Sequence, residues 1–234
     1  MAARSYGQYC GVTTAVEQVG ERWALLIIRD LLVGPRRYTD LKQGLAKVPT
    51  NILSTRLKEL QESGVVRRVP LKNCGLVYEL TDYGRQLEPI VLALGRWGFQ
   101  QMGDPGPDDA VTADSLTVAL HTAFRPEVAA GLEPAHYELH VADVVLRAVV
   151  DGAALQVVQV APAGRPVDPA RRVGVPVPGA ADVVIAAGPG IRRVVSGELT
   201  PDEAVAQDVW RVVSGDAGML DRFAATFHIG PGGS

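Results

Sequence analysis

Residues 48–68, VPTNILSTRLKELQESGVVRR, constrain the fold more than any other stretch of the chain. Leu53, Leu57 and Leu60 recur at helical spacing and predict a helix with one narrow buried stripe. Gly64 ends this helix, because glycine readily adopts the left-handed conformation found at helix C-termini. A basic strand follows directly. The opposite face of the helix carries short hydrogen-bonding side chains in place of the usual mixture of Glu and Lys, which indicates a face that meets another surface.

The neighbouring segments place this helix in a definite order of elements. Apolar residues at helical spacing predict further helices over residues 13–19, 21–33, 38–45 and 81–102. Between the opening helix and the last one, residues 65–69 and 76–80 read as two strands joined by a short loop. The order helix, helix, short helix, helix, hairpin, helix is that of a mainly α winged helix-turn-helix domain.

The outward face of the fourth helix suits double-stranded DNA. Short polar side chains near a helix N-terminus can read base edges in the major groove, and basic side chains on a hairpin can contact phosphates. For each residue taken alone, an ordinary solvated surface is the competing interpretation. The residues expected to contact DNA are Arg37, Thr50, Asn51, Ser54, Thr55, Arg56, Lys58, Arg67, Arg68 and Lys72.

Charge is distributed unevenly along the chain. Residues 1–103 contain 14 Lys and Arg against 9 Asp and Glu, whereas residues 104–234 contain 9 against 17. This asymmetry indicates that the N-terminal part meets a polyanion, although two unrelated domains could also differ in composition by chance.

The chain divides at a stretch rich in proline, glycine and aspartate. We expect a DNA-binding and dimerisation domain over residues 1–102, a linker over 103–113, a second domain over 114–229 and a disordered tail over 230–234. The second domain reads as α+β with a mostly antiparallel sheet, because several apolar strands are flanked by helical segments. These strands are apolar on both faces, so one face is expected to pack on helices. The other face needs a partner, which is a second subunit, the first domain or an apolar ligand.

The N-terminal part resembles the HxlR-type branch of the MarR-like bacterial transcription regulators over about residues 6–100. The matching residues are Cys10, Trp23, Gly34, Pro35, Arg37, Tyr38, Leu53, Leu57, Leu60, Gly64, Tyr78, Leu80, Thr81 and Gly84. The resemblance implies a homodimer, closed by the first and last helices, that binds a pseudo-palindromic operator. Pro49 departs from the serine that family members often carry before the recognition helix, so Thr50 is expected to take over the capping role.

The C-terminal part resembles the sterol carrier protein type-2 fold over about residues 114–229. The motifs are a strand, Asp151-Gly152 and a second strand, then SGELTPDEA, then GDAGMLDRF. The resemblance implies an apolar tunnel that holds a hydrophobic small molecule. The side chains expected to line it, for which plain core packing is the competing interpretation, are Phe124, Val144, Leu146, Trp210, Met219, Phe223 and Phe227.

Cys10 matches a position that some members of the HxlR-type branch use to sense oxidants. We expect instead a half-buried thiol packed against the dimer helices, because Tyr9 and Gly11 supply no charge that would lower its pKa.

The sequence contains no persuasive catalytic constellation, and we expect neither an enzyme nor a cofactor. His136 and His140 have a zinc-ligand spacing only on a helix, and in the strand predicted there they lie roughly 13 Å apart. No metal site is therefore expected. The absence of a signal-peptide core and of a long apolar run predicts a cytoplasmic protein with no membrane partner and reduced cysteines.

These features together predict a transcription regulator whose C-terminal domain responds to an apolar small molecule. One alternative is a carrier of an apolar metabolite with vestigial DNA binding. Another is a DNA-binding regulator whose C-terminal domain serves only for dimerisation.

Overall fold

The computed structural model describes residues 5–71, 75–106, 108–160 and 179–230, which form two compact units. The N-terminal unit extends to Val91 and the C-terminal unit begins at Leu92. The division therefore lies within helix α6 (Glu88–Phe99), ahead of the linker predicted for residues 103–113. Residues 231–234 of the predicted tail lie outside the described residues.

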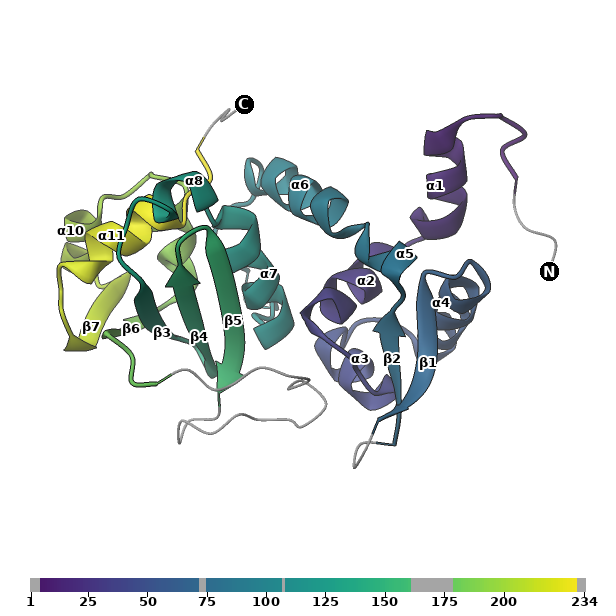
Figure 1. Cartoon of the computed structure of the whole chain (residues 1–234), viewed down its shortest axis with the longest axis horizontal. Helices are drawn as coiled ribbons and strands as arrows, with labels where there is room; N and C mark the ends of the chain where they lie inside the picture. Colours follow the sequence, from purple (N-terminus) through teal and green to yellow (C-terminus); the bar gives the residue numbers. More distant parts are fainter. Residues whose placement is uncertain (1–4, 72–74, 107, 161–178, 231–234) are drawn as a thin grey trace. The chain divides into compact units, whose positions relative to one another are not determined.

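The N-terminal unit has the predicted order of helices and hairpin (Figure 1). Its elements are α1 (Gly11–Val19), α2 (Ala24–Val33), α3 (Tyr38–Gly44), α4 (Thr50–Glu62), β1 (Val66–Leu71), β2 (Gly75–Leu80), α5 (Asp82–Arg85) and the first part of α6. The two strands pair antiparallel, and Arg36 adds a single-residue bridge to Tyr78. The predicted winged helix-turn-helix fold is confirmed.

Helix α4 is held by the stripe of leucines that the sequence predicts. Leu53, Leu57 and Leu60 are each at most 1% exposed. Burying a leucine side chain stabilises a fold by about 1.5–3 kcal/mol, so this stripe is a substantial anchor. The other buried apolar residues of the unit include Ile27, Ile28, Leu31, Leu41, Leu45, Val48, Val65, Val66, Val77 and Leu80.

Polar contacts fix the turn between α3 and α4. The Nζ atom of Lys42 donates to the carbonyl oxygens of Ala46, at 2.9 Å, and Val48, at 2.7 Å. The Oη atom of Tyr38 donates to the Thr50 carbonyl oxygen at 2.9 Å. Side chains of α3 therefore determine where α4 begins.

Two predicted helix boundaries were wrong. The single helix predicted over residues 81–102 is divided into α5 and α6, because Pro89 lacks a backbone N–H and its ring clashes with the Arg85 carbonyl in a continuous helix. Helix α2 begins at Ala24 instead of residue 21, because Trp23 adopts a left-handed backbone conformation with φ of 80°.

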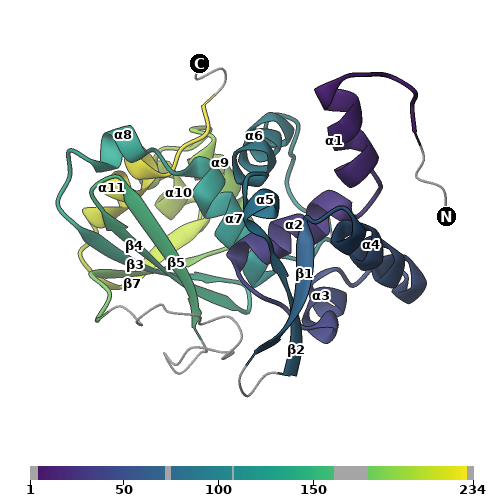
Figure 2. The same cartoon turned by 45° about the vertical axis from the view of Figure 1, so that its right-hand side comes forward.

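The C-terminal unit is α+β with a mostly antiparallel five-stranded sheet, as predicted (Figure 2). The strand order is β5-β4-β3-β6-β7, and only the β3–β6 pair is parallel. The strands are β3 (Ala135–Val141), β4 (Val144–Asp151), β5 (Ala154–Val160), β6 (Val183–Ala187) and β7 (Trp210–Gly215). The helices are α7 (Ala113–Ala123), α8 (Pro126–Ala129), the 3-10 turn η2 (Pro189–Ile191), α9 (Arg192–Val195), α10 (Pro201–Ala206) and α11 (Met219–Thr226).

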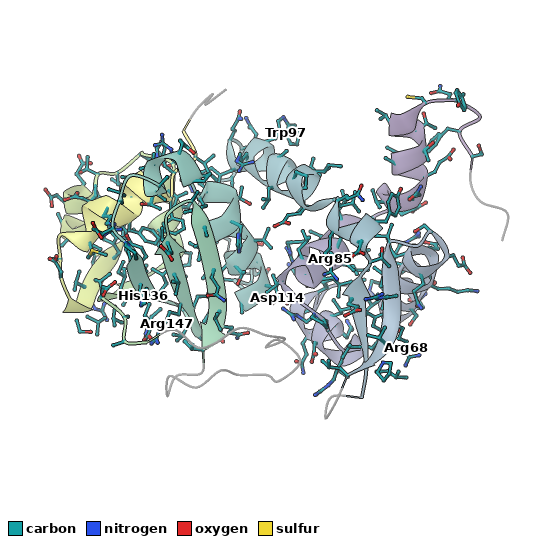
Figure 3. All side chains as sticks on the ribbon, viewed as in Figure 1. Arg68, Arg85, Trp97, Asp114, His136 and Arg147 are labelled. Atoms are coloured by element: carbon teal, nitrogen blue, oxygen red, sulfur yellow. The ribbon has the colours of Figure 1, made fainter. Side chains whose placement is uncertain are left out.

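One face of this sheet packs with the helices in a single hydrophobic core. Tyr137 of β3 and Leu146 of β4 lie on this face, and Leu120 of α7 and Phe223 of α11 belong to the same cluster. The opposite face carries polar side chains, among them Arg147 (Figure 3). Alternation along β3 is regular, because every second residue enters the core.

The described residues contain no helix with the length and apolar character that a bilayer crossing requires.

We predict that Gly84→Ala destabilises the N-terminal unit by about 1–3 kcal/mol, measured by urea unfolding. A Cβ at Gly84 would overlap the carbonyl oxygen of Val65. Gly188→Ala is the control, since that glycine has an ordinary φ of −83° and open space around its Cβ position. Equal unfolding midpoints for the two variants would contradict this packing.

Candidate functional site

The face of α4 opposite the leucine stripe presents short polar side chains to solvent. Thr50, Asn51 and Ser54 are exposed in the first turns of the helix, and Thr55 is partly exposed. Within the described part of the chain, Asn51 makes no side-chain hydrogen bond, so its amide is available to a ligand. The structure thus brings these four predicted residues together on one surface.

Helix α4 starts without a side-chain cap from the described residues. Pro49 occupies the N-cap position, and Thr50 is the first helical residue. The prediction that Thr50 takes over the capping role is therefore wrong, because a residue inside the helix does not have the extended backbone of an N-cap. The first turn also lacks an acidic residue. Backbone N–H groups at such an end attract anions.

The hydroxyl groups of Ser54 and Thr55 are already oriented by hydrogen bonds within the protein. Ser54 Oγ donates to the Thr50 carbonyl oxygen at 3.0 Å and lies 3.2 Å from Tyr38 Oη. Thr55 Oγ1 donates to the Asn51 carbonyl oxygen at 2.9 Å. Each hydroxyl oxygen keeps acceptor capacity, so both groups can still accept a hydrogen bond from a ligand.

Arg56 faces the protein instead of the open surface of α4. Its guanidinium pairs with Glu59 on the same helix and lies 3.3 Å from Glu21 Oε2, in the turn before α2. The side chain is only 14% exposed, whereas Lys58 is 78% exposed. Arg56 therefore positions α4, whereas Lys58 remains exposed, with a pair to Glu62 at 3.6 Å.

The hairpin places basic side chains on both of its faces. Arg67 pairs with Glu79 on the facing strand at 2.7 Å, and Arg68 lies over the ring of Tyr78 at 5.6 Å. Figure 3 labels Arg68 on the hairpin. Both arginines are exposed. Arg37 lies at the start of α3, where its backbone N–H donates to Asp40. Lys72 lies outside the described residues.

The N-terminal unit is similar to known proteins. The family described as HxlR-like helix-turn-helix matches residues 18–105. YvaP of Bacillus subtilis (strain 168), an uncharacterized HTH-type transcriptional regulator, is 38% identical over 88 residues, which are 37% of this chain and 82% of YvaP. The chain belongs to the HxlR-like helix-turn-helix family.

Further relatives match a similar share of this chain. YdeP of Bacillus subtilis (strain 168), also an uncharacterized HTH-type transcriptional regulator, is 31% identical over 91 residues, which are 38% of this chain and 71% of YdeP. The crystal structure of ytcD is 33% identical, with a TM-score of 0.36, and the match covers 39% of this chain and 96% of that one.

Cys10 of this HxlR-like chain lies at the N-cap of α1 and is exposed in the single chain, so its predicted packing against the helices of a dimer stays a prediction. Backbone N–H groups of Thr13 and then Val12 lower the pKa of the Cys10 thiol, with a smaller contribution from the Thr13 hydroxyl. The sequence argument considered only charged neighbours and missed the amides of a helix N-terminus. A redox role for this thiol stays a prediction.

The residues predicted to line a ligand tunnel gather in the core of the C-terminal unit. Phe223 and Phe227 of α11 lie 4.6 Å apart between ring centroids, and Trp210 meets Phe223 edge-on at 5.9 Å. Phe124 packs on Phe227 at 5.8 Å. The remaining three, Val144, Leu146 and Met219, belong to the same cluster or pack against it.

We predict that Arg56→Met lowers the free energy of unfolding by about 1–2 kcal/mol, measured by urea denaturation, because it removes the guanidinium that pairs with both Glu21 and Glu59. Lys58→Met is the matched control on the same helix. Its exposed pair with Glu62, at 3.6 Å, contributes at most about 0.5 kcal/mol. Equal losses in the two variants would contradict a positioning role for Arg56.

Proposed function

We propose that this chain is a homodimeric transcription regulator that binds a pseudo-palindromic operator through α4 and the β1–β2 hairpin. The main support is the arrangement of α4. Three leucines fix this helix, so that its uncapped N-terminus and a face of hydroxyl and amide groups are exposed. The basic β1–β2 hairpin follows it directly in the sequence. The names of the HxlR-like relatives, which are called HTH-type transcriptional regulators, agree with this proposal.

The groups on this surface match the two kinds of contact that DNA offers. The Asn51 amide can make two hydrogen bonds to adenine in the major groove, and the Ser54 hydroxyl can contact either kind of base pair. Lys58 and Arg68 carry their charge at exposed positions suited to phosphates. Arg56 is not included among these contacts, because its charge is already shared with two carboxylates.

Two helices expose apolar side chains that suit a second copy of the chain. None of the nine residues of α1, all of which the structure describes, is buried. On α6, Ile90, Leu94 and Trp97 are exposed at helical spacing, and Trp97 is 71% exposed (Figure 3). A two-fold dimer would cover these side chains and would match the symmetry of a palindromic operator.

The C-terminal unit would supply the regulatory input. We propose that it is a sterol-carrier-like domain that binds an apolar small molecule and thereby alters the affinity for DNA. Such coupling requires that the molecule bind the DNA-competent and the DNA-incompetent states with different affinities. The aromatic cluster around Phe223 supports an apolar binding region.

For DNA recognition, we predict different effects from two substitutions. Arg68→Ala weakens binding to every duplex and lowers the slope of log affinity against log salt by about one unit. Asn51→Ala relaxes the preference at one base pair, at a cost of about 1–3 kcal/mol on the preferred duplex. Fluorescence anisotropy with the chain's own upstream DNA and a scrambled duplex measures both effects.

Arg211→Ala is the control for these DNA measurements, because Arg211 is an exposed arginine on β7 of the C-terminal unit. If Arg68→Ala and Asn51→Ala both leave operator affinity unchanged, the proposed binding of DNA by α4 and the hairpin is wrong. Equal affinity of the unaltered protein for both duplexes would favour the carrier alternative.

For assembly, we predict that Leu94→Glu converts a dimer to a monomer in analytical ultracentrifugation, since a carboxylate would be buried in the apolar contact. Val205→Glu is the matched control, because Val205 is an exposed apolar residue on α10. A dimer that persists in Leu94→Glu would place the interface elsewhere.

A further inference from the structure

Three side chains at helix α11 carry buried polar atoms without a hydrogen-bond partner among the described residues. They are the Oη atom of Tyr137, the Oγ1 atom of Thr226 and the Nε and Nη2 atoms of Arg222. Tyr137 is 0% exposed and Thr226 is 1% exposed. Buried polar groups are almost always hydrogen-bonded in folded proteins, so three in one region require an explanation.

The three groups lie on, or pack against, adjacent sides of helix α11. Arg222 and Thr226 are four residues apart on α11 and therefore share one side of that helix. The Tyr137 ring meets the rings of Phe223 and Phe227, on the neighbouring side of α11, edge-on at 5.3 and 6.1 Å.

The charge of Arg222 also acts on the Tyr137 hydroxyl group. Burial raises the pKa of Tyr137 to about 12, and the positive charge of Arg222 opposes this rise. The carboxylate of Asp182 contributes less, and it accepts a hydrogen bond from the backbone N–H of His136. Tyr137 therefore remains a neutral donor near a cation at physiological pH.

Thr226 differs from the other buried threonines in helices of this unit. Thr117 Oγ1 and Thr122 Oγ1 each donate to the carbonyl oxygen four residues earlier, at 2.7 Å. Thr226 has no such bond, although its own backbone is held in place by the bond from the Arg125 N–H to its carbonyl oxygen, at 2.9 Å. Its hydroxyl group therefore still has a donor to offer.

All three groups can donate hydrogen bonds, and one of them is positively charged. The complementary partner is therefore rich in acceptors and negatively charged, as a carboxylate is. The aromatic rings of Phe223, Phe227 and Trp210 adjoin the same region and favour an apolar body attached to that charge.

We propose that Tyr137, Arg222 and Thr226 form the polar end of the ligand site and bind the carboxylate of an amphipathic organic acid. This inference rests on the proposed ligand-binding role of the C-terminal unit and narrows its ligand to apolar acids. Arg222 is only partly buried, which leaves the charged end of the site near solvent.

The test compares matched pairs of an acid and its neutral analogue by calorimetry on the full chain without DNA. The pairs are decanoate with decanol and naphthoate with naphthol, at neutral pH. We expect at least one acid to bind about tenfold more tightly than its neutral partner, because a charge-assisted hydrogen bond is worth a factor of that order. If neither acid is preferred in either pair, or none of the four compounds binds, the proposal is overturned.

Three variants assign the preference to the residues. Arg222→Gln should abolish the preference for the acid, and Tyr137→Phe and Thr226→Val should each reduce it several-fold without changing the binding of the neutral analogue. Arg211→Gln and Thr122→Val are the matched controls and should leave the preference intact. Equal loss in the controls and the three variants would overturn the assignment.

Stability gives a second readout that does not depend on a ligand. Without ligand, Tyr137→Phe should leave the unfolding midpoint unchanged or raise it, because the deleted hydroxyl group has no partner. A clear fall in the midpoint would show that the hydroxyl group is structurally bonded, and would overturn its role as a free donor. If an acid binds but leaves the affinity for DNA unchanged, the proposed site stands and only the proposed regulation is refuted.

Discussion

Burial of Leu53, Leu57 and Leu60 fixes the rotation of α4 about its own axis. Hydrophobic attraction has no direction, but three leucines in one stripe allow only one side of the helix to face the core. The polar side is thereby forced outward. The hydrogen bonds of Lys42 and Tyr38 then fix the position of the helix along its axis, because they hold the turn from which α4 starts. The proposed DNA surface is the result of these two constraints.

Basic residues that look equivalent in the sequence have different uses in the structure. Arg56 and Lys58 are two positions apart, so they lie about 200° apart around the helix. Arg56 consequently reaches Glu21 and Glu59 at the edge of the packed side, whereas Lys58 extends into solvent. Similarly, Lys42 supports the turn and contributes no exposed charge to the surface of α4. A count of basic residues therefore overstates the charge available to DNA.

The two units leave different kinds of groups unsatisfied, and each kind indicates a partner. In the first unit and along α6 they are exposed apolar side chains such as Trp97, which an identical subunit can cover. In the core of the second they are buried donors on Tyr137 and Arg222, which an apolar neighbour cannot satisfy. Buried donors cost free energy until a ligand or ordered water pairs with them, whereas exposed apolar groups cost little but favour association.

The sequence by itself determined the order of the helices and the hairpin, the α+β character of the second unit and the burial of the leucine stripe, because these depend on local periodicity and turn residues. It did not reveal the break at Pro89 or the late start of α2 after Trp23, because apolar spacing continues through both. Tertiary structure alone decided that Arg56 also pairs with Glu21 and that the charge of Arg222 acts on Tyr137. Those facts depend on interactions between residues far apart in the chain, which no local pattern records.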